Sequence, residues 1–539
     1  MYDYVIVGGG SAGCVMAGRL SEDPSISVCL LEAGPKDDSV FIRAPIGFAV
    51  TASLGIFNWN YQTVPQKQFS DGRRGFQPRG KVIGGSSAVN AMVYTRGNAR
   101  DYDQWASLGN QGWSYAEVLP YFKKSENNEC FGATELRGTG GPLNVAYLRS
   151  PSILNQAFQQ ACQDSGIPFN NDYNGVQQFG VSPAQVTQIN GERCSAARAY
   201  LTPHLGRKNL TVITGALTTR VLFEGRRAVG VEYKRNGQLH VANAKAEVIL
   251  CGGAFGSPQI LMLSGIGPKA QLVKHGINVV LDSPGVGQNL QDHLTTTLIY
   301  RTARKDAALG VSAQGGLTII KAILEWRKKR SGWITTNVAE TQAFITTEGR
   351  QDYPNIQLAL CTGIVDDHTR KQHLGHGYTL HVTLMRPKSR GTVTLQSANA
   401  EDAPLIDMAY LSEAEDLAVL TKAVQLSLGV MEGAALAPYR GKMLYDVDKN
   451  NPEQIRDYLR RNSDTEYHPV GTCKMGPDTD RMAVVDAELR VHGIDRLRVV
   501  DASIMPLLIT GNTNAPTMMI AEKAAVMVLE AGAKERLTI

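Results

Sequence analysis

Hydrophobic and polar positions follow two different periods along the chain, and both occur within its first 32 residues. Residues 4–7 form a short apolar run, which is typical of a buried strand, and it leads into the glycine-rich stretch 8–13. Apolar positions then recur with helical spacing to about Pro24, and a second apolar run at residues 28–31 ends at Glu32. The pattern predicts a strand, a glycine turn, a helix and a second strand.

The residue types in this turn indicate a phosphate-binding role. Gly8 permits a tight turn, Gly10 lets a pyrophosphate approach the backbone, and Gly13 lets the helix pack closely on the strand. The helix N-terminus then offers unpaired N–H groups and a positive dipole end to an anion. Glu32, 19 residues after Gly13, holds the place of the acid that binds both hydroxyls of an adenosine ribose. The segment is therefore predicted to bind a dinucleotide, whose identity the spacing does not decide.

Two later segments carry further signs of a ligand-binding α/β domain. Residues 78–94 are rich in glycine and serine, and we expect a loop that lies flat against a ligand, with Ser86, Ser87 and Asn90 as hydrogen-bond partners. Residues 210–213, 228–233 and 247–250 are predicted strands, and a glycine junction at 251–254 leads into a helix at 257–263. The chain is predicted to return to the nucleotide-binding domain there.

The stretch from about residue 302 to 458 differs from the rest of the chain. Its alternating apolar and polar positions, as in 378–385 and 391–395, together with an amphipathic stretch near 412–432, predict a separate antiparallel α+β domain. Four histidines in this part suggest a metal site: His368, His373, His376 and His381. No carboxylate or cysteine completes a recognisable ligand set, so we favour a solvated loop over a metal site.

Composition limits the classes of protein that the chain can represent. With 539 residues it is expected to form two or more domains, and 43% hydrophobic and 19% charged residues are typical of a globular protein. A formal net charge of +5 over this length indicates no nucleic-acid partner. No apolar run approaches the length of a membrane span, whereas peripheral association with a membrane stays open.

The expected location is the cytoplasm, either free or at the inner face of the membrane. The N-terminus lacks the basic region of a signal peptide, and cleavage there would remove the glycine turn. The eight cysteines include no C-x-x-C pair, which favours reduced thiols.

The last 75 residues return to glycine-rich and polar motifs, at 467–473, 497–503 and 511–516. Asn514 suits a helix cap and Pro516 a first-turn position, so a helix is predicted to begin there. His468 lies in the first of these motifs, and by itself it reads more readily as a buried histidine bonded to backbone than as a catalytic base.

Taken together, these motifs resemble the glucose–methanol–choline (GMC) oxidoreductase family, flavoenzymes that oxidise alcohols. The family's first signature fits residues 80–94, and its second fits residues 253–267 at every defined position. The N-terminal turn and the C-terminal histidine and asparagine segments complete the match in the right order. Within the family the chain resembles the bacterial choline-dehydrogenase-like branch, which includes alcohol and polyethylene glycol dehydrogenases.

The resemblance implies an α/β plus α+β fold with FAD as the cofactor. A Rossmann-like FAD-binding domain would be assembled from residues 1–155, 196–310 and 466–539, and residues 156–195 and 311–465 would form a substrate domain with an antiparallel sheet over the flavin. Carried over position by position, the cofactor-binding residues would be Gly8, Gly10, Ser11, Ala12, Gly13, Glu32, Ala33, Trp59, Gly80, Val82, Gly85, Ser86, Asn90, Ala91, Met92, Val93, Val221, Asp501, Ala502, Asn514, Ala515 and Pro516.

Catalysis is carried over to His468 and Asn512, where some relatives have a second histidine in place of the asparagine. Some relatives also attach the flavin through a histidine, but Val89 stands at that position, so we expect non-covalent FAD. The resemblance implies an alcohol dehydrogenase that passes electrons to a quinone or another non-oxygen acceptor. An alcohol oxidase is the alternative, and a hydroxynitrile lyase or photodecarboxylase on the same fold is a further one. The family offers no metal site, and the oligomeric state is not indicated.

Overall fold

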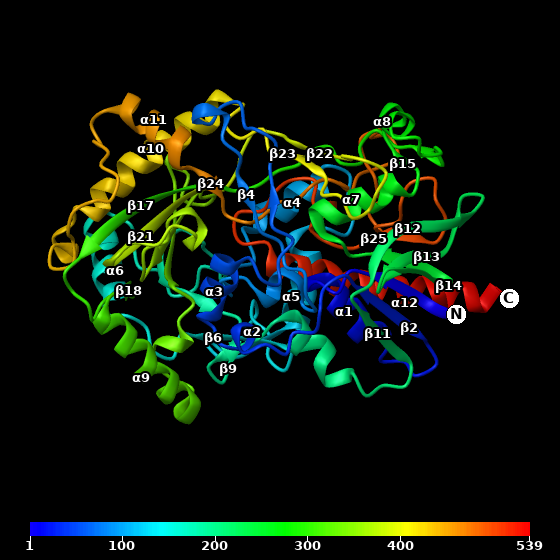
Figure 1. Ribbon diagram of the computed structural model, residues 1–539, viewed down its shortest axis with the longest axis horizontal. Coiled ribbons are helices and arrows are strands. Elements are labelled where there is room, and N and C mark those ends of the chain that lie inside the picture. The colour runs from blue at the N-terminus through cyan, green and yellow to red at the C-terminus, as the bar shows by residue number, and fades with distance from the viewer. Residues whose placement is uncertain (539) are drawn as a thin grey trace.

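Two seven-stranded sheets organise the chain, and the computed structural model describes residues 1–538 of it, with side chains through residue 533 (Figure 1). The first sheet has the order β11-β2-β1-β14-β13-β12, and β25 also pairs with β14. Its strands are β1 (Tyr2–Val7), β2 (Val28–Glu32), β11 (Leu210–Thr214), β12 (Leu217–Glu224), β13 (Arg227–Arg235), β14 (Gln238–Leu250) and β25 (Leu497–Val499). Pairing is parallel from β11 through β14 to β25, and antiparallel among β12, β13 and the first half of β14.

The predicted N-terminal unit is confirmed as β1, α1 (Ser11–Leu20) and β2. β14 is much longer than the predicted run at 247–250, because its first half forms a hairpin with β13 before its second half joins β1. α7 (Gly253–Leu263) follows β14, as predicted, but begins four residues before Ser257. The resulting parallel core is the Rossmann-like arrangement, with the carboxyl ends of β1, β2 and β14 at one edge.

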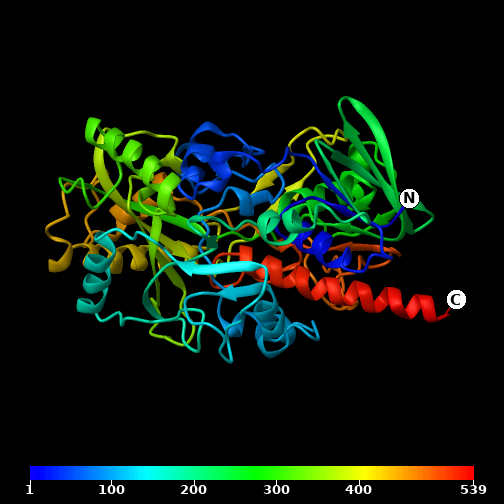
Figure 2. The same cartoon turned by 90° about the horizontal axis from the view of Figure 1, so that it is seen from below.

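A long C-terminal helix covers the same sheet. α12 (Asn514–Thr538) runs beside α1 and α5 (Tyr115–Ser125), and Figure 2 shows it as the red rod along this half of the molecule. The buried carboxylate of Glu522 accepts two close hydrogen bonds from Arg19 of α1 and one from the hydroxyl of Tyr200, which ties segments some 500 residues apart in the sequence. The predicted helix start at Asn514 is confirmed as the first residue of α12.

The second sheet is antiparallel and has the order β24-β17-β21-β20-β19-β7, with β18 also pairing with β21. Its strands are β7 (Gly180–Pro183), β17 (Leu294–Thr302), β18 (Gly310–Val311), β19 (Ala339–Ile345), β20 (Ile356–Cys361), β21 (Gly375–Leu384) and β24 (Asp464–Thr465). β17 lies within the 196–310 segment assigned above to the FAD-binding domain, yet it pairs with β21 from Thr295 to Thr302. The sheet therefore draws a strand from outside 156–195 and 311–465.

Strand periodicity gives this sheet two unlike faces. On β20, Ile356, Leu358 and Leu360 pack in an apolar core with three helices, whereas Gln357 and Ala359 face the first domain. The three helices are α6 (Leu154–Asp164), α10 (Ala414–Met431) and α11 (Pro452–Asn462). α10 confirms the amphipathic helix predicted near 412–432.

We expected the four histidines of this domain to lie in a solvated loop, and that expectation was wrong for three of them. His376 and His381 lie on β21 and are buried, and His368 is buried against Tyr467 and Asp464. His376 stands between Gly375 and Gly377, which give no strand signal, whereas His381 lies within the β-like run predicted at 378–385, so placing it in a loop conflicted with that prediction. Within residues 1–538, no group of three His, Cys, Asp or Glu side chains is arranged to hold a metal ion.

The remaining elements are short and connect or flank the two sheets. The helices are α2 (Val40–Arg43), α3 (Gly47–Leu54), α4 (Ala99–Ser107), α8 (Lys269–Lys274) and α9 (Ala313–Lys329). The strands are β3 (Tyr61–Gln62), β4 (Phe76–Gln77), β5 (Glu126–Asn128), β6 (Leu143–Tyr147), β8 (Gln185–Val186), β9 (Gln188–Ile189), β10 (Glu192–Arg193), β15 (Ile266–Gly267), β16 (Leu281–Asp282), β22 (Thr392–Thr394) and β23 (Leu405–Asp407). Among the described residues, none of the helices has the length and apolar character needed to cross a bilayer.

Candidate active site

A large cavity lies between the two sheets and receives residues from both. From the first sheet it is lined by the carboxyl ends of β1, β2 and β14, including Val7, Glu32 and Cys251. From the second it is lined by Gln342 of β19 and by Gln357 of β20. Ligands of parallel α/β sheets bind at the carboxyl ends of the strands, so the cavity occupies the expected place for a dinucleotide.

The glycine turn brings the backbone of α1 to the wall of this cavity. Gly8 has a φ of +98°, and a Cβ on Gly13 would lie 1.8 Å from the Gly8 carbonyl oxygen. Gly10 and Gly85 touch in the same way, because a Cβ on Gly85 would lie 2.6 Å from the Gly10 Cα. Gly10, Ser11 and Ala12 line the cavity at the first turn of α1, where backbone N–H groups have no intrahelical partner. The tight turn predicted at Gly8 and the close packing predicted at Gly13 thus match the geometry.

A second helix N-terminus meets the first one across the cavity. Asn512, Thr513 and Asn514, at the start of α12, line the wall, and the Ser11 hydroxyl donates to the Asn514 side-chain oxygen over 2.8 Å. Both helices are longer than eight residues and direct their positive dipole ends at the same space. The cavity is therefore suited to an anionic ligand.

Glu32 is the buried carboxylate at the end of β2. It accepts hydrogen bonds from the backbone N–H of Gly9 at 2.8 Å and of Gly34 at 2.7 Å. Burial raises its pKa to about 7, against the opposing effect of these hydrogen bonds. The side chain lines the cavity and retains acceptor capacity for hydroxyl donors, as a ribose ligand requires.

Most of the cofactor-binding residues expected from the sequence lie around this one cavity. Those that line it are Gly8, Gly10, Ser11, Ala12, Glu32, Ala33, Trp59, Gly80, Gly85, Ser86, Asn90, Ala91, Met92, Val93, Asp501, Ala502 and Asn514. Gly13, Val82, Val221, Ala515 and Pro516 are absent from the lining. Val82 packs with Ile42 and Ala88, and Val221 is buried on β12, while Leu217 and Thr218 of the same strand face the cavity.

The carboxylate of Asp501 is occupied by its own protein neighbours. It accepts from the backbone N–H of Gly253 at 2.8 Å, from the Ser257 hydroxyl at 2.6 Å and from the backbone N–H of Ser503 at 2.8 Å. Asp501 therefore holds the start of α7 against the C-terminal segment, so that the backbone of both lines the cavity.

His468 and Asn512 meet in the wall of the same cavity. The Asn512 amide nitrogen lies 3.0 Å from His468 Nε2, although the residues are 44 positions apart. Gln357 donates to the Asn512 Oδ1 at 3.2 Å and is itself bonded to the Gln342 oxygen at 2.8 Å. Because the oxygen of Asn512 is held by Gln357, its NH₂ group is directed at His468.

A second histidine decides which nitrogen of His468 carries the proton. His293 Nε2 lies 3.1 Å from two backbone carbonyls, those of Met385 and Ile509, so this nitrogen must be the donor. Burial lowers the pKa of His293 to about 4, so the ring is neutral and its Nδ1 is an acceptor. His468 Nδ1, 3.0 Å away, must then donate to it. We assign the lone pair of His468 to Nε2, the nitrogen that faces Asn512 and the cavity.

His468 is neutral at neutral pH. Burial lowers its pKa well below the ordinary 6.5, and His293 and Arg79 act in the same direction. A neutral imidazole with its lone pair directed into a cavity, beside an amide donor, can accept a proton from a bound hydroxyl while the amide stabilises the oxygen.

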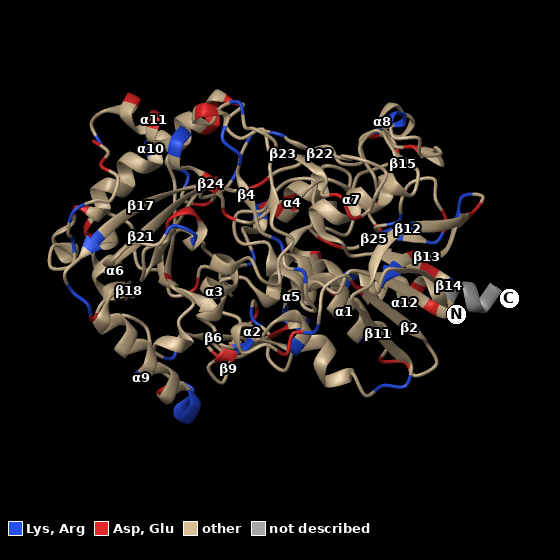
Figure 3. Ribbon diagram, viewed as in Figure 1, with Lys and Arg blue, Asp and Glu red and all other residues tan. Residues whose placement is uncertain are grey.

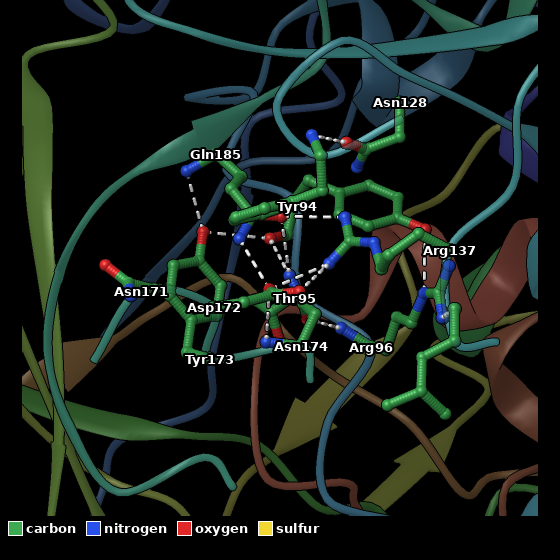
Figure 4. Close-up of polar contacts among 12 residues, drawn as sticks. Tyr94, Thr95, Arg96, Asn128, Arg137, Asn171, Asp172, Tyr173, Asn174 and Gln185 are labelled. Carbon is green, nitrogen blue, oxygen red and sulfur yellow. Dashed lines mark hydrogen bonds and ion pairs between the residues drawn. The ribbon is translucent and has the colours of Figure 1, made fainter. Parts of the chain in front are cut away.

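A buried ion-pair network supports the loop that ends beside this site. Glu126 on β5 binds Arg96 and Arg137, each over 2.6 Å, and all three side chains are 1% exposed or less. Figure 4 shows this region, where Asp172, Asn174 and Gln185 complete the contacts to the segment that follows Val93. The network anchors the C-terminal end of the glycine-serine loop.

Sequence reasoning did not single out His293, Gln342 or Gln357. His293 ends the glycine-containing polar stretch 284–293 and directly precedes β17. The available signal was the presence of these two glutamines in largely apolar strands, β19 and β20. On β20, Gln357 lies on the same face as Ala359, and both line the cavity.

Comparison with known proteins shows to which family the chain belongs. The sequence profile of GMC oxidoreductases matches residues 2–295, and the C-terminal profile of the same family matches residues 387–521. The chain belongs to the GMC oxidoreductase family. The resemblance noted in the motifs is thereby confirmed, as is the fold class.

Relatives of this GMC oxidoreductase match over nearly their whole length. The alcohol dehydrogenase [acceptor] of Pseudomonas putida is 44% identical over 98% of this chain and 96% of its own. The mitochondrial choline dehydrogenase of Homo sapiens is 47% identical over 97% of this chain and 89% of its own. The crystal structure of pyridoxine 4-oxidase from Mesorbium loti superposes with a TM-score of 0.88 at 33% identity, covering 98% of this chain and 99% of its own.

These findings identify the protein as an FAD-dependent oxidoreductase that acts on CH–OH donors. The residues present fit FAD: two helix N-termini line the cavity and would favour an anionic pyrophosphate there, and Glu32 would offer a carboxylate to the ribose hydroxyls. The close approach of Gly10 and Gly85 leaves backbone rather than side chains at the wall that the cofactor would contact.

Proposed function

We propose that this GMC oxidoreductase oxidises a neutral alcohol to an aldehyde or ketone and passes the electrons to a quinone or another non-oxygen acceptor. The observation that carries the proposal is the neutral His468, whose Nε2 lone pair is directed at Asn512 and the cavity. FAD supplies a hydride acceptor when bound. The protein must therefore supply the base and hold the hydroxyl in place.

His468 acts as the base in this proposal. An alcohol gives up hydride readily only as its oxygen loses the proton, so a base must lie within hydrogen-bond reach of that oxygen. The substrate hydroxyl takes the place of the Asn512 NH₂ group at the single lone pair of His468 Nε2 and donates to it, and the resulting imidazolium keeps its Nδ1–H bonded to His293. Asn512 donates to the developing alkoxide through its NH₂ group, which Gln357 keeps correctly oriented.

A neutral alcohol suits the cavity better than a quaternary ammonium alcohol such as choline. Glu466 lines the cavity and precedes His468 by two residues. Its carboxylate is already paired with His381, whose Nδ1 lies 3.0 Å away. Despite burial, the pair keeps the pKa of Glu466 low and that of His381 high, so both are charged and balance each other. One face of Trp59 is likewise taken, because the Lys81 ammonium lies 4.3 Å from its ring centre.

Anaerobic bleaching of the flavin by a panel of alcohols tests this function. Neutral primary alcohols should bleach the flavin faster than choline does, and slow recolouring in air would distinguish a dehydrogenase from an oxidase. His468→Ala should slow reduction by about 10²–10⁴-fold and Asn512→Ala by about 10–10³-fold, with normal FAD content. His492→Ala, at a half-buried histidine outside the cavity, is the matched control. Wild-type reduction rates in His468→Ala would refute the assignment.

FAD binding without a covalent bond is part of the proposal. Val89 lines the cavity and has no nucleophilic atom. Acid precipitation should therefore release yellow flavin into the supernatant, and flavin retained in the pellet would contradict it. A hydroxynitrile lyase or photodecarboxylase would show no alcohol-dependent bleaching. The cytoplasm remains the expected location.

A further inference from the structure

α9 exposes an apolar stripe at the edge of the molecule. Leu317, Ile320 and Leu324 follow the i, i+3, i+7 spacing of one helix face and are 60%, 58% and 55% exposed. Ile323 beside them is 42% exposed. Large aliphatic side chains are rarely exposed together in this way on a monomer, so the stripe marks a contact surface.

The opposite face of α9 already has its packing partner. Ala322 and Trp326 are buried against Ala44 and Ile334, and the Trp326 indole donates to the Gly191 carbonyl over 2.7 Å. The helix is therefore fixed in orientation by this side, and the exposed stripe is not a face that the rest of the chain could cover by a rotation of α9.

A cluster of cations flanks the stripe. Lys321, Arg327, Lys328 and Lys329 are exposed, and within the described part of the chain none of them forms an ion pair. Figure 3 shows blue positions gathered at the C-terminal end of α9. Glu325 is the helix's one carboxylate, and it accepts from the Ser331 hydroxyl.

A second exposed apolar pair continues the surface at the other end of the helix. Val311, two residues before α9, forms a strand bridge with Leu374, and these side chains are 47% and 81% exposed. Lys371, three residues from Leu374, is also exposed. Aliphatic side chains edged by lysine and arginine are the pattern of a helix that lies in the headgroup region of an anionic bilayer.

We propose that α9, with Val311 and Leu374, docks this protein on an anionic lipid bilayer. Leu317, Ile320, Ile323 and Leu324 would enter the boundary between headgroups and acyl chains, and the four unpaired cations would contact lipid phosphates. A second copy of the chain fits the surface less well, because a two-fold interface would bring the same uncompensated cations together.

Docking at α9 would bring the active-site cavity close to the membrane. Ala44 and Ile46, which pack against α9, precede α3 directly, and Phe48, Thr51 and Ala52 of α3 line the cavity. Apolar alcohols and quinone acceptors partition into bilayers, so both reactants would be concentrated at this side. This consequence rests on the proposed function, whereas the docking itself does not.

Co-sedimentation of the FAD-loaded full-length protein with vesicles tests the docking. Vesicles of equal parts phosphatidylcholine and phosphatidylglycerol should carry the protein into the pellet, and vesicles of phosphatidylcholine alone should leave it in solution. The triple variant Arg327→Gln, Lys328→Gln, Lys329→Gln should bind roughly 100-fold more weakly at low salt. The variant Leu317→Asn, Ile320→Asn, Leu324→Asn should bind at least about tenfold more weakly.

The double variant Leu239→Asn, Val241→Asn is the matched control, because both side chains are exposed on β14 at the other end of the molecule. It should bind vesicles like the wild type, and all variants should retain alcohol-dependent flavin bleaching in solution. Absence of wild-type binding to the anionic vesicles, or an equal loss in the control, would overturn the proposal. A wild-type dimer that the Leu317, Ile320 and Leu324 substitutions split, with vesicle binding unchanged, would overturn it in favour of a second copy. A protein that no alcohol bleaches but that binds the vesicles through α9 would refute the proposed function alone.

Discussion

Replacing His293 should slow flavin reduction although His293 is not among the residues that line the cavity. His293→Phe keeps a ring of similar shape but removes the acceptor for His468 Nδ1–H, 3.0 Å away. A buried donor without a partner costs about 1–3 kcal/mol. His468 escapes this cost by moving its proton to Nε2, and that tautomer has no lone pair for the substrate hydroxyl. If this tautomer is favoured by about 1–3 kcal/mol, the fraction of His468 with its lone pair on Nε2 falls by about 5- to 150-fold. The reduction rate should fall by the same factor.

The variant His293→Asn separates the positioning role from a structural one. The Asn oxygen takes the place of the imidazole Nδ1 and can accept from His468, whereas the donor to the Met385 and Ile509 carbonyls is lost in both variants. Anaerobic rapid mixing should therefore find most of the rate restored in His293→Asn, at a thermal stability as low as that of His293→Phe. His376→Asn, at a buried histidine bonded to Ser312 outside the cavity, controls for general damage. Equal reduction rates in the two His293 variants, at normal FAD content, would refute the tautomer argument.

Three further outcomes follow from the charges of the site and its support. Glu32→Ala should weaken FAD binding by about 1.5–3 kcal/mol in a titration of the apoprotein, and unchanged affinity would count against its ribose contact. Because burial lowers the pKa of His468 well below 6.5, the flavin reduction rate at saturating FAD and alcohol should hold from neutral pH down to about 6.5. It should fall only at more acidic pH, where protonation removes the base, so a fall already centred near neutral pH would contradict a lowered pKa. Glu126→Ala should cost about 3–5 kcal/mol of unfolding free energy in chemical denaturation, because Arg96 and Arg137 would stay buried without their partner, and a near-neutral effect would show that the network carries no stability.

The nucleotide-binding half of the fold could be predicted because its signals are local. The glycine turn, the apolar runs of β1 and β2 and Glu32 lie within one stretch of 32 residues, and each has one physical reading. β14 was recognised only in its last four residues, since its first half is polar and exposed as part of a hairpin. The family resemblance assigned β17 to the first domain, but in the structure β17 pairs with β21, some 80 residues later in the sequence.

The site could be predicted to the level of its family motifs and no further. His468 and Asn512 were found together through the resemblance, and the 3.0 Å contact between them agrees with a shared role. The glutamines that orient Asn512 come from adjacent strands, and their pairing appears only once β19 and β20 are in register. The burial of His376 could not be predicted, because its neighbours Gly375 and Gly377 give no strand signal, whereas the burial of His381 could have been inferred from the predicted run 378–385.

The protonation pattern of the base depends on both halves of the protein at once. His293 stands at the start of β17 in the second sheet, and the carbonyls that fix its proton belong to Met385, after β21, and to Ile509, before α12. His468 receives that constraint through one contact, which leaves its lone pair on Nε2, where Asn512 donates to it at the cavity wall. If the second sheet shifted by about 1 Å relative to α12, one hydrogen bond from His293 Nε2 to these carbonyls would become too long to hold its proton there. Glu32 and the first turn of α1 would stay in place. The proposed ribose contact of Glu32 therefore depends mainly on the first sheet, whereas the tautomer of the proposed base depends on how the two sheets are docked.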